Sequence, residues 1–291
     1  MAFAFGCRAV GSRRLFFACG FGQGAERPVV LALRPVLRCR RAAGLVFILT
    51  ERRLGAESMK IDVITVFPEM FRGFFGESML KRASAMGVAE IRTVDLRDFA
   101  TDRRRTVDDK PYSGGPGMLM KPDVWFQAIE ACLGDRSIPA RVVMTTPAGR
   151  PYVQRVAEEF SLAEHLIILC GHYEGIDERV KALVTDEISM GDFVLTGGEI
   201  PAAAIVDSVV RLLPGVLGGG AEAAARESFG SEGLLEAPQY TRPPEYRGMK
   251  VPDVLVNGDH AKTEGWRKRQ AFDLTSRNRP DLIAMGGTYA V

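Results

Sequence analysis

Three short apolar runs, each followed at once by a bend that contains glycine or proline, constrain the fold of this chain more than any other feature. The runs cover residues 142–144, 165–169 and 193–195. Each has the length of a buried strand, and segments with helical periodicity lie between them. This βαβα alternation predicts an α/β fold with a mostly parallel sheet that helices cover on both faces.

The bends after these runs predict where a ligand binds. In an open α/β sheet, the ligand crevice forms at the carboxyl ends of the strands. The bends at 145–150, 170–175 and 195–201 follow directly from the runs and are rich in glycine and proline. Because glycine lets the backbone turn sharply and approach a ligand closely, we predict one pocket lined by backbone rather than by long side chains.

Hydrophobic periodicity predicts the other elements of the body of the chain. We expect strands at 60–67, 88–96, 141–145, 165–170 and 192–195, and helices at 68–86, 122–133, 151–160, 176–183, 198–213 and 259–277. The first helix is expected to turn five apolar side chains inward, namely Met70, Phe71, Phe74, Phe75 and Leu80. The small residues of 218–225 indicate a flexible interdomain linker at 218–228.

Charge divides the chain into an amino-terminal extension and a body. Residues 1–58 carry ten arginines, no lysine and three acids, a net charge of +7, so 59–291 carry −5 of the overall +2. Three interpretations of the extension are open: an organelle-targeting presequence, a structured extension, or a stretch that is disordered or lies upstream of a true start at Met59. The last is favoured, because a clean strand begins at Met59.

Composition and motifs exclude several classes of protein. The 291 residues include five cysteines without CxxC spacing, which is typical of a reduced, cytoplasmic protein. No apolar run approaches the roughly 20 residues of a membrane helix, so no membrane partner is expected. The three histidines, His165, His172 and His260, lack metal-ligand spacing, and no metal site is predicted. P-loop and nucleophile-elbow motifs are also missing from the sequence.

Two groups of charged residues admit both a structural and a functional interpretation. The polar, glycine-rich stretch 101–117 is too long for a simple connection, which favours a functional or mobile loop. Its arginines at 103–105 form either a solvated loop or a phosphate contact. Arg211 lies on an apolar helix, where an arginine is unfavourable unless it is paired or faces a site. Glu227 lies just beyond the small residues of the linker and could equally be an ordinary exposed charge.

Several motifs resemble the bacterial tRNA (guanine-N1)-methyltransferase family, over about residues 59–283. The motifs that carry this resemblance lie at 67–71, 102–118, 171–179, 191–199, 207–208, 214–218 and 240–243. The resemblance implies methyl transfer from S-adenosyl-L-methionine to N1 of guanosine 37 in tRNA, by a homodimer. It implies a deep trefoil knot of the SPOUT class in residues 59–217 and a small helical tRNA-binding domain at 229–291.

The resemblance also assigns roles to residues. Glu227 is the base, reaching across the dimer, and Arg211 supports the guanine O6. The cofactor is held by Met144, Thr145, Pro147, Gly171, Tyr173, Glu174, Gly175, Met190, Gly191, Leu195, Gly197, Gly198 and Pro201. The tRNA is held by Arg103, Arg105, Asp108, Asp109, His260 and Arg269.

Two residues depart from the family pattern. Glu227 stands where the family has aspartate, and Ser113 where its loop has glycine. The longer carboxylate at 227 leaves open a catalytically impaired RNA-binding protein of the same fold. A related knotted methyltransferase that acts on another RNA atom is a third interpretation.

Overall fold

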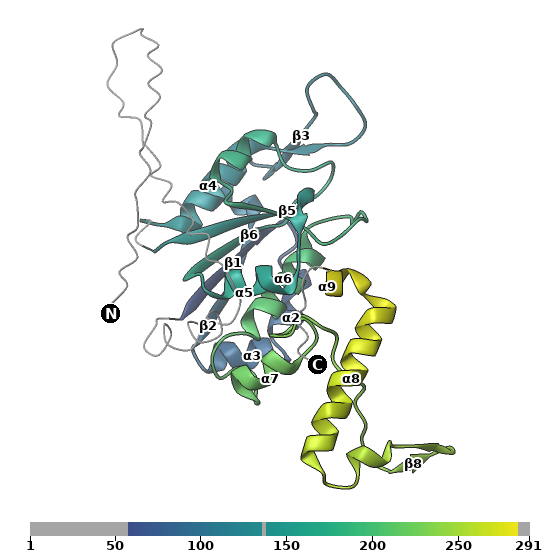
Figure 1. The fold of residues 1–291 in the computed structure, drawn as a ribbon. Coiled ribbons are helices and arrows are strands. Elements are labelled where there is room, and N and C mark those ends of the chain that lie inside the picture. Colours follow the sequence, from purple (N-terminus) through teal and green to yellow (C-terminus); the bar gives the residue numbers. More distant parts are fainter. Residues whose placement is uncertain (1–57, 136–137, 285–291) are drawn as a thin grey trace, which may run out of the picture. The chain divides into compact units, whose positions relative to one another are not determined.

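A computed structural model describes residues 58–135 and 138–284 of the chain (Figure 1). The predictions for the extension 1–58 therefore lie outside the described residues, except at Ser58. Within the described ranges, no helix is both long enough and apolar enough to cross a membrane.

The core of the fold is a five-stranded sheet in the order β2-β1-β6-β5-β7. The strands are β1 (Met59–Thr65), β2 (Ala89–Asp95), β5 (Ala140–Pro151), β6 (His165–Leu169) and β7 (Asp186–Ser189). Every pairing in this sheet is parallel. The central strand β6 is buried at every residue, because both of its faces are covered. The predicted α/β fold with a mostly parallel sheet is thus confirmed.

Helices cover both faces of the sheet and enclose two hydrophobic clusters (Figure 1). Residues of α2 (Glu69–Phe75), α3 (Ser78–Ala85), α5 (Gln154–Ser161) and α6 (Glu199–Val210) pack in the first cluster. Residues of α4 (Pro122–Leu133) and the 3₁₀ helices η1 (Leu96–Phe99) and η2 (Glu178–Leu183) pack in the second. Side chains along β6 alternate between the clusters, as the period of two in a strand requires.

Two predicted elements were wrong in part. The helix expected at 68–86 is two helices, α2 and α3, because Ser78 has a φ of 51° in the left-handed region and interrupts the helical path. Phe71 and Leu80 are buried as expected, whereas Met70 and Phe74 are 55% and 43% exposed. The short helix expected at 176–183 is the 3₁₀ helix η2.

The strand expected at 192–195 does not form, and β7 lies upstream of it. Gly191 has a φ of 134°, and its N–H donates to the Ser189 hydroxyl, so the chain turns away after β7. Phe193 and Val194 then lie 56% and 84% exposed in a loop. The polar sequence of β7 hid it, because the carboxylate of Asp186 is buried by ion pairs rather than by apolar neighbours.

The carboxyl-terminal region is mainly helical. The segment predicted as the linker contains α7 (Gly220–Arg226), and its flexibility stays a prediction. Beyond it lie the hairpin β8 (Glu245–Tyr246) and β9 (Met249–Lys250), the 3₁₀ helix η3 (Asp253–Leu255), α8 (His260–Asn278) and α9 (Pro280–Ala284). The helix expected at 259–277 is α8. Thr275 of α8 is buried and accepts a hydrogen bond from the Leu235 N–H, which ties the segment after α7 to this helix.

Candidate active site

Three bends meet at the carboxyl edge of the sheet, as the sequence predicts. The N–H of Gly198 donates to the Gly171 carbonyl at 2.8 Å, and His172 forms a backbone bridge with Gly197. A Cβ on Gly198 would collide with the Thr145 hydroxyl and lie 2.7 Å from Cys170 Cα. The chain therefore closes at this point only because position 198 has no side chain.

The remaining residues predicted to hold the cofactor differ in their exposure. Met144 and Pro201 are buried, and Met190 packs against the core. Tyr173 is 46% exposed and has a φ of 58°, which is strained for a residue other than glycine. The others that reach the surface are Pro147, Glu174 and Leu195. Gly175 and Gly191 both have positive φ, at 123° and 134°.

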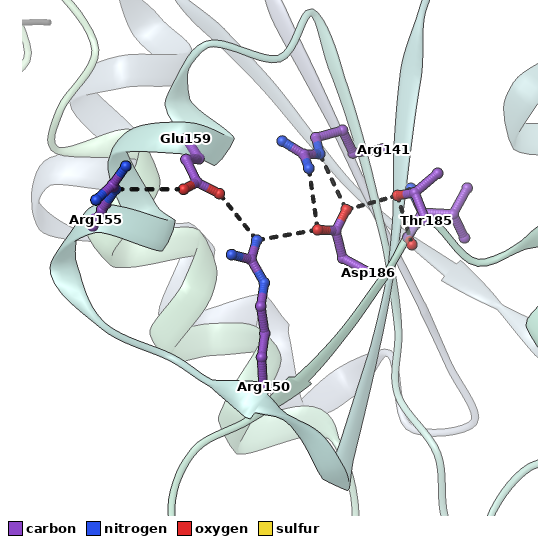
Figure 2. Close-up of polar contacts among 7 residues, drawn as sticks. Arg141, Arg150, Arg155, Glu159, Thr185 and Asp186 are labelled. Carbon is purple, nitrogen blue, oxygen red and sulfur yellow. Dashed lines mark hydrogen bonds and ion pairs between the residues drawn. The ribbon is translucent and has the colours of Figure 1, made fainter. Parts of the chain in front are cut away.

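An ion-pair network on the edge strand β7 fixes the bend that interrupts β5 (Figure 2). Thr145 and Arg150 both pair with Ile188, so the residues between them form an excursion from the strand. Asp186 accepts hydrogen bonds from Arg141, before the excursion, and from Arg150, after it, at 3.1 Å each. The guanidinium of Arg150 also contacts Glu159 of α5 at 3.1 Å. This network holds both ends of the excursion that contains Thr145 and Pro147.

The predicted substrate loop lies against the predicted cofactor bend. The strands β3 (Asp108–Asp109) and β4 (Leu119–Met120) form an antiparallel pair at the base of this loop. Glu174 N–H donates to the Met118 carbonyl at 3.0 Å, and Met120 N–H donates to the Gly175 carbonyl at 2.9 Å. A Cβ on Gly117 would meet the Glu174 side chain. The base of this loop is thus joined to the 171–175 bend by backbone hydrogen bonds.

The arginines of this loop differ in what they contact. The Arg105 guanidinium is bound to the Asp98 carboxylate and donates to the Arg97 carbonyl at 3.2 Å, and Arg105 has a φ of 55°. Arg103 is exposed. Asp102 accepts from the Thr106 N–H at 2.9 Å, and this hydrogen bond is the main reason that the pKa of Asp102 is lowered. Arg105 and Asp102 therefore organise the loop, and Arg103 is the arginine more available to a ligand.

The two residues predicted to be catalytic contact each other. Arg211 caps the end of α6, and Glu227 follows α7. The Arg211 Nη2 donates to both Glu227 oxygens, at 2.7 and 2.6 Å. This contact forms within a single chain, and the predicted reach of Glu227 across a dimer stays a prediction.

Two of the predicted tRNA contacts lie on α8. His260 and Arg269 lie exposed on α8, where their predicted contact with tRNA stays a prediction.

Burial raises the pKa of the Cys170 thiol well above its usual range, so a thiolate nucleophile is not favoured beside the bends. In the part of the chain that the structure describes, no group of three His, Cys, Asp or Glu side chains is placed to hold a metal ion.

Sequence reasoning missed two residues of this site, His172 and Glu199. Glu199 is 4% exposed and accepts a hydrogen bond from the Thr65 hydroxyl. The His172 Nδ1 lies 3.9 Å from Glu199 Oε2. In the sequence, only their position next to glycines of the bends points to these two residues. Their side chains come close to each other only in the folded chain.

A parallel α/β sheet, glycine-rich bends that meet at its carboxyl edge and a carboxylate–arginine pair are typical of an α/β enzyme. Comparison with known families gives the particular family. Residues 59–285 match the family described as tRNA (Guanine-1)-methyltransferase TrmD, and the chain belongs to this family.

Curated relatives support the assignment. The tRNA (guanine-N(1)-)-methyltransferase of Shouchella clausii is 55% identical over 225 residues, covering 77% of this chain and 91% of the relative. The proteins of that name from Dictyoglomus turgidum and Moorella thermoacetica are 51% and 52% identical, and 90% of each is covered. The family match at 59–285 includes the residues of the predicted site.

Proposed function

We propose that this chain transfers a methyl group from S-adenosyl-L-methionine to N1 of guanosine 37 in tRNA, next to the anticodon. The Arg211–Glu227 pair carries the proposal, because it supplies a base and a cation at one place in a member of this family. A catalytically impaired RNA-binding protein is not favoured, since the carboxylate is retained and reaches the arginine.

The bends fit S-adenosyl-L-methionine in their chemistry. Glycine-rich bends come together at the carboxyl edge of the sheet, and backbone groups of such bends can recognise an adenine without charged side chains. The pocket residues named above would hold the cofactor, and Leu195 and Tyr173 offer apolar surface to it. When bound, the cofactor supplies a methyl group already activated on a positively charged sulfur.

The protein must then remove a proton and stabilise a negative charge. Guanine N1 carries a proton, so it becomes a nucleophile only when a base takes that proton. The Glu227 carboxylate accepts it in this proposal. As the proton leaves, negative charge grows on O6, and the Arg211 guanidinium stabilises it. The 2.6 Å contact supports this assignment, because it brings the Glu227 carboxylate and the Arg211 guanidinium to one place.

We also propose that the enzyme works as a homodimer in the cytoplasm, where its tRNA substrate is. Exposed apolar side chains beside the site support a second copy: Val194, Ile200 and Phe193 are 84%, 61% and 56% exposed. A cluster of exposed apolar residues of this kind is typical of an interface. Sedimentation at micromolar concentration measures the state, and a monomer that remains active would contradict the dimer.

One reaction tests the function directly. The purified protein is incubated with S-adenosylmethionine labelled in its methyl group and with a tRNA that carries guanosine at positions 36 and 37. We expect one labelled nucleoside, N1-methylguanosine at position 37. A label on another base, or on a ribose, would contradict the proposed substrate atom, and cofactor binding without transfer would restore the impaired RNA-binding alternative.

A further inference from the structure

A buried carboxylate lies at the bends assigned to the cofactor, and the mechanism above does not use it. Glu199 is the first residue of α6 and is 4% exposed. Its Oε1 accepts a hydrogen bond at 2.9 Å from the Thr65 hydroxyl at the end of β1. Because a buried charged group is unfavourable unless it is paired and hydrogen-bonded, one hydroxyl leaves the second oxygen in need of a partner.

His172 is the side chain placed to become that partner. Its Nδ1 lies 3.9 Å from Glu199 Oε2, about 1 Å beyond a hydrogen bond. The same nitrogen is buried and has no hydrogen-bond partner among the described residues. The rings of Phe67 and Tyr173 contact the imidazole edge-on, with centroids 5.0 and 5.1 Å away, and so fix its plane. A potential donor and an under-satisfied acceptor therefore face each other.

The space between the two side chains is free, so the gap can close by side-chain movement alone. A Cβ on Gly197 would lie 2.6 Å from His172 Nδ1 and would collide with Glu199 Oε2, so glycine keeps the space between them free. The backbone of the 171–175 bend is itself held, because Gly198 N–H donates to the Gly171 carbonyl and Met120 N–H donates to the Gly175 carbonyl. The His172 and Glu199 side chains, rather than the backbone, are thus the parts that close the gap.

We propose that His172 and Glu199 form a positioning pair that fixes the 171–175 bend against the start of α6 when the cofactor binds. The His172 Nδ1–H donates to Glu199 Oε2, so that Thr65, Glu199 and His172 join the end of β1, the start of α6 and the bend. The pair acts on cofactor affinity and not on the methyl-transfer step. This inference rests on the proposed function, because it takes the bends to be the site of S-adenosylmethionine.

Two variants of His172 separate its hydrogen bond from its ring. In His172→Phe the ring contacts remain and Nδ1 is lost, whereas in His172→Asn the amide nitrogen takes the place of Nδ1. By titration calorimetry of the full chain with S-adenosylmethionine, we expect Phe to weaken binding about tenfold and Asn to restore most of the loss. Wild-type affinity in His172→Phe, or a loss in Asn as large as in Phe, would overturn the pair.

A double-mutant cycle tests whether the two residues act together. We expect Glu199→Gln to weaken cofactor binding in the wild type and to have a smaller effect in the His172→Phe background. Additive effects would mean that the residues act independently and would overturn the proposal.

Nitrogen NMR of the labelled imidazole gives a readout that fold stability alone would not change. On addition of S-adenosylmethionine we expect the His172 Nδ1 signal to become that of a protonated, hydrogen-bonded nitrogen, and this change to be altered in Glu199→Gln. An unchanged Nδ1 signal in a wild-type protein that binds the cofactor overturns only the positioning pair. A wild-type protein that binds no cofactor overturns the proposed function itself, and the pair with it.

Discussion

The cofactor bends and the segments assigned to tRNA are built in opposite ways. At the bends, backbone meets backbone: Gly198 donates to Gly171, and position 198 has no room for a methyl group. The tRNA segments instead present exposed charged side chains, such as Arg103 and the arginines of α8. From this difference we expect one added atom at the bends to reduce cofactor binding sharply. Each charge removed from the tRNA segments should instead weaken tRNA binding by a small step.

The largest effect is expected at the Arg211–Glu227 pair rather than in either region. Glu227→Gln keeps the size of the side chain and removes its ability to take a proton, so the single-turnover rate should fall about 10²- to 10⁴-fold. The dissociation constants for cofactor and tRNA should stay within about twofold, because the variant changes the chemistry and not the binding surfaces. Glu227→Asp is the matched control and should retain activity. A wild-type rate in Glu227→Gln would exclude Glu227 as the base.

Mixed dimers sharpen the assignment of this pair. Arg211→Ala and Glu227→Gln should each be nearly inactive alone. If Glu227 acts on the neighbouring subunit of a symmetric dimer, a one-to-one mixture of the two should recover about a quarter of the wild-type sites. We expect this recovery, measured as the single-turnover amplitude. Its failure in a mixture that forms heterodimers would place the pair within one chain, as in the 2.6 Å contact seen here.

The next largest effect should come from one added methyl group at the bends. In Gly198→Ala the new Cβ would lie 2.7 Å from Cys170 Cα, so backbone must shift. Overpacking of this kind costs about 1–3 kcal/mol, which corresponds to roughly five- to 150-fold weaker cofactor binding. Gly73→Ala is the control, because its Cβ would meet nothing within 4 Å. Equal cofactor affinities of the two variants, measured by calorimetry, would contradict the expected intolerance of the bends to an added methyl group.

The sheet could be predicted from the sequence wherever burial comes from apolar side chains. The runs at β5 and β6 were recognised for that reason. β7 was missed because Asp186 is buried by arginines at 3.1 Å, a kind of burial that hydrophobic patterning does not register. The strand prediction at 192–195 was wrong for the opposite reason, because the apolar side chains of 193–195 are exposed.

The site could be predicted only in part, for a related reason. Glycine-rich bends after strands indicate a pocket, and the bends do meet. The pairing of His172 with Glu199, and of Arg211 with Glu227, depends on how distant segments pack, and no local pattern encodes it. The resemblance to a family supplied the second pair and gave no indication of the first.

A smaller effect is expected from a single charge in the tRNA segments. Arg103→Ala should weaken tRNA binding by less than tenfold and lower the slope of affinity against salt by about 1, because one phosphate contact is lost. Cofactor affinity should not change. The control is Arg155→Ala, which removes an arginine that is 76% exposed on α5 and pairs with Glu159. Filter binding at several salt concentrations measures both quantities, and equal slopes for the two variants would exclude Arg103 as a phosphate contact.

The smallest effect should come from Ser113, where the family resemblance predicts glycine. Ser113 has a φ of 68°, a conformation that costs a residue with a Cβ about 1 kcal/mol and that glycine adopts freely. Ser113→Gly should therefore strengthen tRNA binding by less than about fivefold, since the greater freedom of glycine before binding offsets part of the gain. Ser113→Val should shift the affinity the other way, because a β-branched residue is least tolerant of positive φ. Both changes should stay graded, with cofactor affinity unaltered. If Ser113→Val instead abolished cofactor binding as sharply as Gly198→Ala, the loop would share the rigidity of the bends, and the two regions would be one.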